Sequence, residues 1–235
     1  MKLWEFLKDN EVVVLTGAGI SADSGIPTFR GKDGLWNKYK PEELATPEAF
    51  RRNPKLVWEW YMWRMEKVFN AKPNKAHLAL AKLEEMGIVK AVITQNVDNL
   101  HERAGSKNVI HLHGRIDEAR CEVCGRIVRF EKPIKEIPYC CSMMRPNVVW
   151  FGEALPEDAL KKSIELVEKY DVLVVGTSGV VQPAASLPII AKKAGNKVAE
   201  VNVEESAITP IVDIFVRGRA SEVFEEILRI IEQTS

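Results

Sequence analysis

The segment Val12–Arg30 constrains this chain most, because it joins a continuous apolar run to a glycine-rich turn. Val12–Leu15 are four consecutive apolar residues, three of them β-branched, and predict a strand covered on both faces. The turn then reads Gly17-x-Gly19-x-x-Ala22, the pattern of a dinucleotide-binding strand–turn–helix. There the first glycine permits the tight turn and the second lets a pyrophosphate approach the backbone. The small alanine lets the helix pack close to the sheet, with its free N–H groups aimed at the phosphates.

The residues after this turn depart from the layout of a hydride-transfer enzyme. Such enzymes place an acidic residue about 20 positions later to hold the adenosine ribose, and no clear candidate is present. Instead the segment 25–31 is too rich in glycine and proline to continue a helix. An ordinary β–α turn competes with the glycine pattern taken alone. The irregular loop with Phe29 and Arg30 indicates a nucleotide site whose reactive end is covered by a loop.

Composition excludes several classes of protein. The 33 basic and 33 acidic residues give a net charge of zero, which removes the electrostatic case for strong nucleic-acid binding. No apolar run reaches the roughly 18 residues of a membrane span, and residues 1–9 are too charged for a signal peptide. Four cysteines in one short region favour a metal site over a disulfide framework. We expect a soluble, cytoplasmic protein that does not bind membranes.

Strand and helix signals alternate, which predicts an α/β fold with a mostly parallel sheet and helices on both faces. Helices are expected from Asn74 to Gly87, from Pro156 and after Ser221. Two segments interrupt the alternation: residues 31–71 show helix starts but no strand, and residues 115–147 hold the cysteines. The expected strands are Val12–Leu15, Val89–Ile93, Val109–Leu112, Val172–Val175 and Val198–Val201.

These features, with five further blocks, resemble the sirtuins, the NAD-dependent protein lysine deacylases. The blocks occur in the order of that family and span nearly the whole chain. They are Thr94–His101, His111–Gly114, Val148–Glu153, Gly176–Ser178 and Gln182–Ala185.

The resemblance implies a domain division and a reaction. Residues 1–30, 72–114 and 148–235 would form a Rossmann-like NAD-binding domain, while 31–71 and 115–147 would supply the helical and zinc-ribbon-like parts of a smaller domain. The acyl-lysine oxygen displaces nicotinamide from NAD. A histidine then takes a proton from the ribose hydroxyls, and water completes the transfer to O-acyl-ADP-ribose. An NAD-dependent protein mono-ADP-ribosyltransferase and a non-catalytic NAD-sensing interaction module are the alternatives. The partners are acylated proteins, with a DNA-associated protein as one conceivable substrate.

The polar run after the expected strand Val89–Ile93 should emerge at the carboxyl edge of the sheet, where α/β folds bind ligands. A helix cap needs only one such residue, so the run exceeds that need. By resemblance Asn96 and Asp98 recognise the nicotinamide carboxamide and act in catalysis, and Asn202 contacts the adenosine ribose. The NAD contacts implied are Gly17, Ala18, Gly19, Ala22, Phe29, Arg30, Gln95, Asn96, Asp98, Gly176, Thr177, Ser178 and Asn202.

His113 is the expected general base, because histidine titrates near neutral pH and the family's base precedes a glycine, as here. His111 is its rival, two positions earlier. His77 and His101 are expected on a helix surface or behind the site. By resemblance, a substrate peptide adds as a strand between two edges and is read mainly through its backbone. The alternative for Val148–Glu153 is a plain buried strand that ends in a turn. The implied contacts of the peptide are Val149, Phe151, Gly152, Glu153 and Val180.

Tyr61 and Arg64 are three apart in a helical segment and share a face, where a phenol and a guanidinium together suit a carboxylate. The same spacing marks the sirtuin subgroup that removes succinyl and malonyl groups, so we expect these acyl groups, with acetyl alongside. The alternative is a core tyrosine and a solvated arginine.

Cys121-x-x-Cys124 resembles half of a structural zinc site, and the adjacent pair Cys140-Cys141 stands where the family usually has a second Cys-x-x-Cys. Neighbouring cysteines point differently along an extended chain, so using both on one ion requires a strained turn. We expect a tetrahedral four-cysteine zinc that stabilises the small domain. A three-cysteine site, a weak or empty site and an oxidised Cys140–Cys141 bond remain alternatives.

Overall fold

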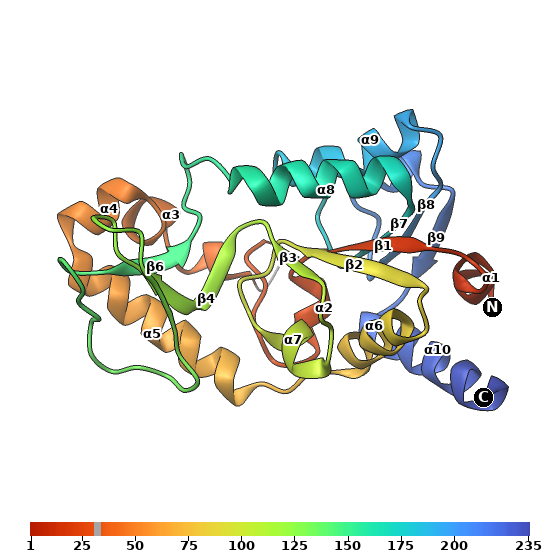
Figure 1. Ribbon diagram of the computed structural model, residues 1–235, viewed down its shortest axis with the longest axis horizontal. Helices are drawn as coiled ribbons and strands as arrows, with labels where there is room; N and C mark the ends of the chain where they lie inside the picture. The colour runs from red at the N-terminus through yellow and green to blue at the C-terminus, as the bar shows by residue number, and fades with distance from the viewer. Residues whose placement is uncertain (31–33) are drawn as a thin grey trace.

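A computed structural model describes residues 1–30 and 34–235, and its centre is a parallel six-stranded sheet (Figure 1). The strand order is β3-β2-β1-β7-β8-β9, which confirms the expected α/β architecture. The strands are β1 (Val12–Thr16), β2 (Val89–Thr94), β3 (Val109–His111), β7 (Asp171–Val175), β8 (Val198–Asn202) and β9 (Ile214–Arg217).

The order reverses between β1 and β7, which pair in parallel with Thr16 opposite Val175. From β1 the chain proceeds outward to β2 and β3 on one side, and from β7 to β8 and β9 on the other. The chain therefore continues from β1 and from β7 toward opposite edges of the sheet. In open α/β sheets this switch point is where ligands bind.

Helices cover both faces of the sheet (Figure 1), which explains why its strands are mostly apolar. Val12 and Val14 pack with α1, α6 and α10, whereas Val13 and Leu15 pack with α8 and α9. Asn74 caps α6 as expected. The helices of this part are α1 (Lys2–Leu7), α2 (Gly19–Ala22), α6 (Lys75–Glu85), α7 (Leu100–Ala104), α8 (Glu157–Lys169), α9 (Leu187–Lys193) and α10 (Ala220–Thr234), with 3₁₀ turns η2 (Ala184–Ser186) and η3 (Thr209–Ile211).

A third hydrophobic cluster lies at the other end of the molecule, where one long helix and several short ones pack against a three-stranded antiparallel sheet (Figure 1). Trp58 is buried there, and its Nε1 donates a hydrogen bond of 3.0 Å to the carbonyl of Met144. The domain boundaries stay a prediction. The elements are η1 (Leu35–Asn37), α3 (Pro41–Leu44), α4 (Pro47–Arg52), α5 (Pro54–Asn70), β4 (Gly114–Arg120), β5 (Ile127–Arg129) and β6 (Arg145–Val148).

Three strands were not expected from the sequence, β4, β5 and β9, and one expected strand is shorter than its apolar run. β6 ends at Val148, so only the first residue of the expected run Val148–Glu153 lies in a strand. The remaining residues form a turn. Within residues 1–30 and 34–235, no helix is both long and apolar enough to cross a membrane.

Candidate active site

The loops after β1 and β7 are in direct backbone contact. Gly17 N donates to the carbonyl of Val175 at 3.0 Å, and Gly19 N donates to that of Gly176 at 2.8 Å. A Cβ built on Gly17 would lie 2.7 Å from the oxygen of Gly176, and one on Gly19 would lie 2.7 Å from its Cα. Gly176 itself has a φ of +66°, which favours glycine. The glycine pattern is therefore required by the packing of these two loops.

The helix after the glycine turn is short, and it packs differently from the prediction. Ile20 and Ser21 are its buried residues, whereas Ala22 is exposed, so the expected packing of this alanine against the sheet is wrong. The N–H groups of Gly19, Ile20 and Ser21 already bond to backbone carbonyls. The helix spans only four residues because Gly25 and Pro27 follow it closely.

The loop after β2 carries Asn96 and Asp98, both buried. Asn96 Nδ2 donates to the carbonyl of Gly17 at 2.9 Å, which ties this loop to the glycine turn. Asp98 accepts from Leu100 N at 3.0 Å and from Ser21 Oγ at 2.8 Å. Burial raises the pKa of Asp98, although both hydrogen bonds oppose that shift.

His77 supports this arrangement from α6. Its Nδ1 accepts from the backbone N–H of Asn74 at 3.0 Å, so Nε2 carries the proton and donates to Ser21 Oγ at 3.3 Å. Burial, with a smaller contribution from Arg103, lowers the pKa of His77 to about 4. His77 and His101 are both fully buried, so the surface position offered for them is wrong. Ser21 was not predicted as a site residue. The available sequence signal was the capping box Asn74-x-x-His77, which places His77 at the start of α6.

Two cavities adjoin the loop. A narrow one of about 30 Å³ is bordered by Ala18, Ser21, Asn96 and Asp98, among others. A larger one of about 250 Å³ includes Arg30 and Gln95 in its wall. Three residues border both cavities: Phe29, Arg64 and Val97. Gly31, the last residue of the predicted covering loop, lies outside the described residues.

His113 lines the larger cavity and has one ring nitrogen engaged. Its Nδ1 donates to the carbonyl of Gln95 at 3.0 Å, which leaves Nε2 with a lone pair in the neutral ring. Burial lowers the pKa of His113, and the hydrogen bond to Gln95 partly opposes this. His113 is therefore placed to accept a proton at Nε2 near neutral pH.

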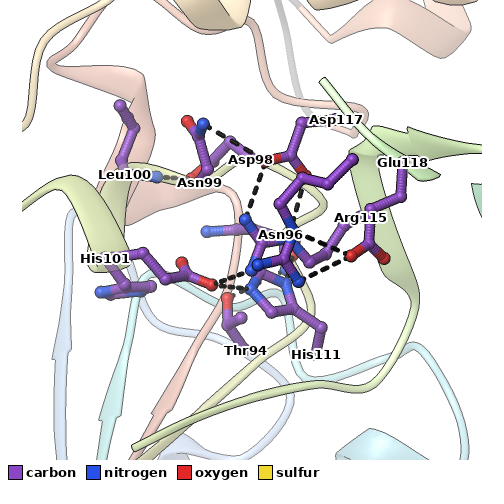
Figure 2. Close-up of polar contacts among 12 residues, drawn as sticks. Thr94, Asn96, Asp98, Asn99, Leu100, His101, His111, Arg115, Asp117 and Glu118 are labelled. Carbon is purple, nitrogen blue, oxygen red and sulfur yellow. Dashed lines mark hydrogen bonds and ion pairs between the residues drawn. The ribbon is translucent and has the colours of Figure 1, made fainter. Parts of the chain in front are cut away.

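Both ring nitrogens of His111, the rival base, face oxygen atoms. Nδ1 lies 3.0 Å from the carbonyl oxygen of Asn96, and Nε2 lies 2.7 Å from Oε2 of Glu102 (Figure 2). His111 would have to break one of these contacts before it accepted a proton from a ligand. The geometry favours His113.

Thr177 connects the β2, β7 and β8 loops. Its Oγ1 accepts from Gln95 Nε2 at 3.0 Å, and its carbonyl accepts from Asn202 Nδ2 at 2.8 Å. Gly179 N also donates to this hydroxyl, at 3.3 Å. Ser178 beside it is exposed. Gln95, Thr177 and Asn202 thus lie together.

The segment predicted to contact a peptide is an exposed turn beside the larger cavity. Val149 N donates to the carbonyl of His113 at 2.8 Å, and Gly152 has a φ of +86°. Phe151 and Val180 are exposed. Glu153, unlike the other residues of this segment, has a carboxylate that is already hydrogen-bonded. It accepts two bonds from the guanidinium of Arg145, at 2.7 and 2.8 Å, and one from the backbone N–H of Trp150.

Tyr61 and Arg64 share a face of α5 and line the larger cavity together with His113. The hydroxyl of Tyr61 accepts from Trp150 Nε1 at 2.9 Å. The guanidinium carbon of Arg64 lies 4.7 Å from the ring centroid of Trp60 and 4.8 Å from that of Phe29. Burial lowers the pKa of Arg64 and raises that of Tyr61. Arg64 is thus half-buried among aromatic rings.

The four cysteines converge, although only Cys121 is buried. Their Sγ atoms all lie within 4.8 Å of one another, and those of Cys124 and Cys140 are 3.7 Å apart. A zinc ion with Zn–S bonds of about 2.3 Å would place tetrahedral sulfurs about 3.8 Å apart. A tight hairpin aligns the adjacent pair, since Cys140 N donates to the carbonyl of Ser142 at 3.0 Å. The cluster is compatible with a structural zinc ion.

Comparison with known proteins agrees with this geometry. Residues 17–183 match the Sir2 family. NAD-dependent protein deacylase 1 of Archaeoglobus fulgidus is 58% identical over 224 residues, which cover 93% of this chain and 91% of the relative. The NAD-dependent protein deacylase of Pyrococcus abyssi is 60% identical over 227 residues, which cover 92% of this chain and 91% of the relative.

Solved structures superpose closely as well. A Sir2 homologue in complex with NAD has a TM-score of 0.92 at 54% identity, covering 99% of this chain and 94% of that chain. A Sir2 structure with a deacetylated peptide and 3′-O-acetyl ADP-ribose has a TM-score of 0.88 at 39% identity, covering 97% of this chain and 96% of that chain. The family match spans most of the chain, and the curated relatives exceed half identity over nearly its full length. The chain therefore belongs to the Sir2 family, the sirtuins.

Proposed function

We propose that this chain is an NAD-dependent protein lysine deacylase that consumes NAD and releases nicotinamide and O-acyl-ADP-ribose. Membership of the Sir2 family supports this, with relatives named as NAD-dependent protein deacylases and a similar structure that holds NAD. The substrates are acylated lysines of proteins, which the peptide-bound Sir2 structure supports.

The assignment of the general base depends on the hydrogen bonds of the two histidine rings at the end of β3. His113 has a free Nε2 and lines the larger cavity, whereas both nitrogens of His111 are engaged. His113 is the general base, which takes a proton from the ribose hydroxyls of the co-substrate. Asn96 and Asp98 border the narrow cavity and bind the nicotinamide carboxamide, with Asp98 as the acceptor.

The acyl group occupies the larger cavity and carries a carboxylate. Arg64 supplies the positive charge in a setting of aromatic rings, and the hydroxyl proton of Tyr61 is available because the oxygen accepts from Trp150. The substrate backbone adds beside residues 149–152 and Val180 as an extra strand. A zinc ion, bound by the four cysteines, stabilises the small sheet and takes no part in the chemistry.

The decisive experiment incubates the protein with NAD and a mixed panel of succinyl-, malonyl- and acetyl-lysine peptides, and identifies products by mass. We expect free lysine peptides, nicotinamide and O-acyl-ADP-ribose. His113→Ala should retain NAD binding by calorimetry and lose deacylation by about a hundredfold or more. ADP-ribosylated peptide would favour the transferase, and NAD binding without turnover would favour a sensing module.

A further inference from the structure

Both ring nitrogens of His111 lie within hydrogen-bond distance of groups that can only accept. The first acceptor is the backbone carbonyl of Asn96, and the second is the carboxylate of Glu102. Burial alone would raise the pKa of Glu102, but the hydrogen bond and charge of His111, with Arg115, lower it, so this group is ionised. Only 8% of the His111 side chain is exposed, so solvent does not compete strongly for these contacts.

Glu102 extends the contact into a network that joins α7, β3, β4 and the loop after β2. Figure 2 shows Arg115, Asp117 and Asn99, which belong to this network, together with His111. Arg115 Nη1 donates to Glu102 at 2.8 Å, and its Nε and Nη2 form a fork on Asp117 at 2.9 and 2.8 Å. Asn99 Nδ2 lies 3.4 Å from the same carboxylate. The side chains of Arg115 and Asp117 are 13% and 2% exposed, so these are mostly desolvated ion pairs with defined geometry.

The network holds one side of the loop whose other side borders the narrow cavity. β4 contributes a backbone contact as well, since Ile116 N donates to the carbonyl of Val97 at 2.8 Å. His113 and His111 donate to the successive carbonyls of Gln95 and Asn96. The two histidines of one strand end therefore set the orientation of two consecutive peptide groups in the loop.

We propose that His111 is a positioning residue for the deacylation reaction, which together with Glu102 fixes the Asn96 peptide so that the side chains of Asn96 and Asp98 face the nicotinamide cavity. The proposal rests on the proposed function for the identity of the ligand. Without the bond from His111, the carbonyl between Asn96 and Val97 loses its hydrogen bond, and this peptide group can change its orientation. The amide and the carboxylate then lose their common orientation toward the ligand.

The test compares His111→Leu, which removes both contacts, with His111→Asn, whose amide nitrogen can occupy the place of Nδ1 and donate to the Asn96 carbonyl. We expect His111→Leu to raise the KM for NAD and the inhibition constant of nicotinamide about tenfold, the cost of one buried hydrogen bond. The kcat at saturating NAD and the KM for peptide should change about twofold at most. His111→Asn should restore most of the affinity. Arg129→Gln, which removes a neighbouring ion pair with Glu118, is the matched control.

Equal effects of Leu and Asn on melting temperature and kcat, with an unchanged KM for NAD, would overturn the proposal. Calorimetric titration with NAD and with nicotinamide gives the same comparison without turnover, so it separates this inference from the proposed function. If the variants do not fold, ¹⁵N spectra of the wild-type imidazole decide. A protonated Nδ1 of His111 supports the proposal, and a bare Nδ1 contradicts it.

Discussion

Arg64 illustrates how an aromatic setting alters one charged side chain. A solvated helix arginine would contact water, but this guanidinium packs against the rings of Trp60 and Phe29. Arg64 borders both the narrow and the larger cavity, so its guanidinium can contact a ligand in either one. A half-buried cation of this kind gains from an anionic ligand, since a low-dielectric setting strengthens charge-assisted hydrogen bonds.

Replacing Arg64 by methionine keeps the length of the side chain and removes its charge and its donors. We expect kcat/KM for a succinyl-lysine peptide to fall about 10- to 100-fold, because one or two charge-assisted hydrogen bonds are lost. Turnover of the acetyl-lysine peptide should change about threefold or less. Steady-state kinetics on matched peptides measures both, with Arg51→Met on the exposed face of α4 as control. An unchanged succinyl-to-acetyl ratio would exclude a carboxylate clamp.

Several candidate residues could be identified from the sequence because they follow strand ends. The loop 95–98 and His113 come directly after apolar runs, which places them at the carboxyl edge of a parallel sheet. Ser21 and His77 could not be identified in this way. They contact each other across 56 positions of the chain, and local periodicity contains no information on such a distant partner.

At the scale of elements, the five expected strands are present because the sheet is covered on both faces and each strand is made mostly of apolar residues. β4 was missed because its charged side chains are paired with distant groups, as Glu118 is with Arg129. Such pairing conceals the alternation by which a half-buried strand is recognised. β9 is a half-exposed edge strand of four residues, too short for a clear pattern.

The sequence also did not decide the structure around Cys140 and Cys141, because two adjacent cysteines can bind one ion only if the chain makes a strained turn. The turn at 138–144 supplies it, with an isolated bridge between Tyr139 and Met143. Both Cys140 and Cys141 therefore reach the group formed by Cys121 and Cys124. Local hydrogen bonding across such a short turn cannot be deduced from cysteine spacing.

We expect one zinc ion per chain in the purified protein, and loss of that ion in Cys141→Ser. Metal release should lower the melting temperature and the activity together, because the ion connects β4 to the hairpin that leads into β6. Elemental analysis and thermal unfolding with and without a chelator measure these effects. Ser142→Ala is the matched control in the same turn. Stoichiometric zinc in Cys141→Ser would indicate three protein ligands.

At the scale of the whole molecule, two buried histidines connect the central sheet to the loops of the active site. His77 and His101 have ring centroids 5.1 Å apart and are fully buried. His101 Nε2 lies 3.0 Å from Thr16 Oγ1 at the end of β1. Burial places the pKa of each ring below its ordinary value, to about 4 for His77 and well below 6.5 for His101. Both rings are therefore neutral in the folded protein near neutral pH.

Acid should destabilise the fold through these rings. Unfolded His77 binds a proton near pH 6.5 and folded His77 only near pH 4, so the contribution to stability is present above pH 6.5 and is lost as the pH falls toward 4. His77 alone should lower the free energy of unfolding by about 1.4 kcal/mol per pH unit, or about 3 kcal/mol in total. Urea unfolding between pH 7 and pH 4.5 measures this slope, and His77→Asn should reduce it by about one proton. Leu78→Ala, on the exposed face of the same helix, should lower stability without changing the slope. An identical slope in His77→Asn and the wild type would mean that His77 does not bind its proton differently in the folded and unfolded chains.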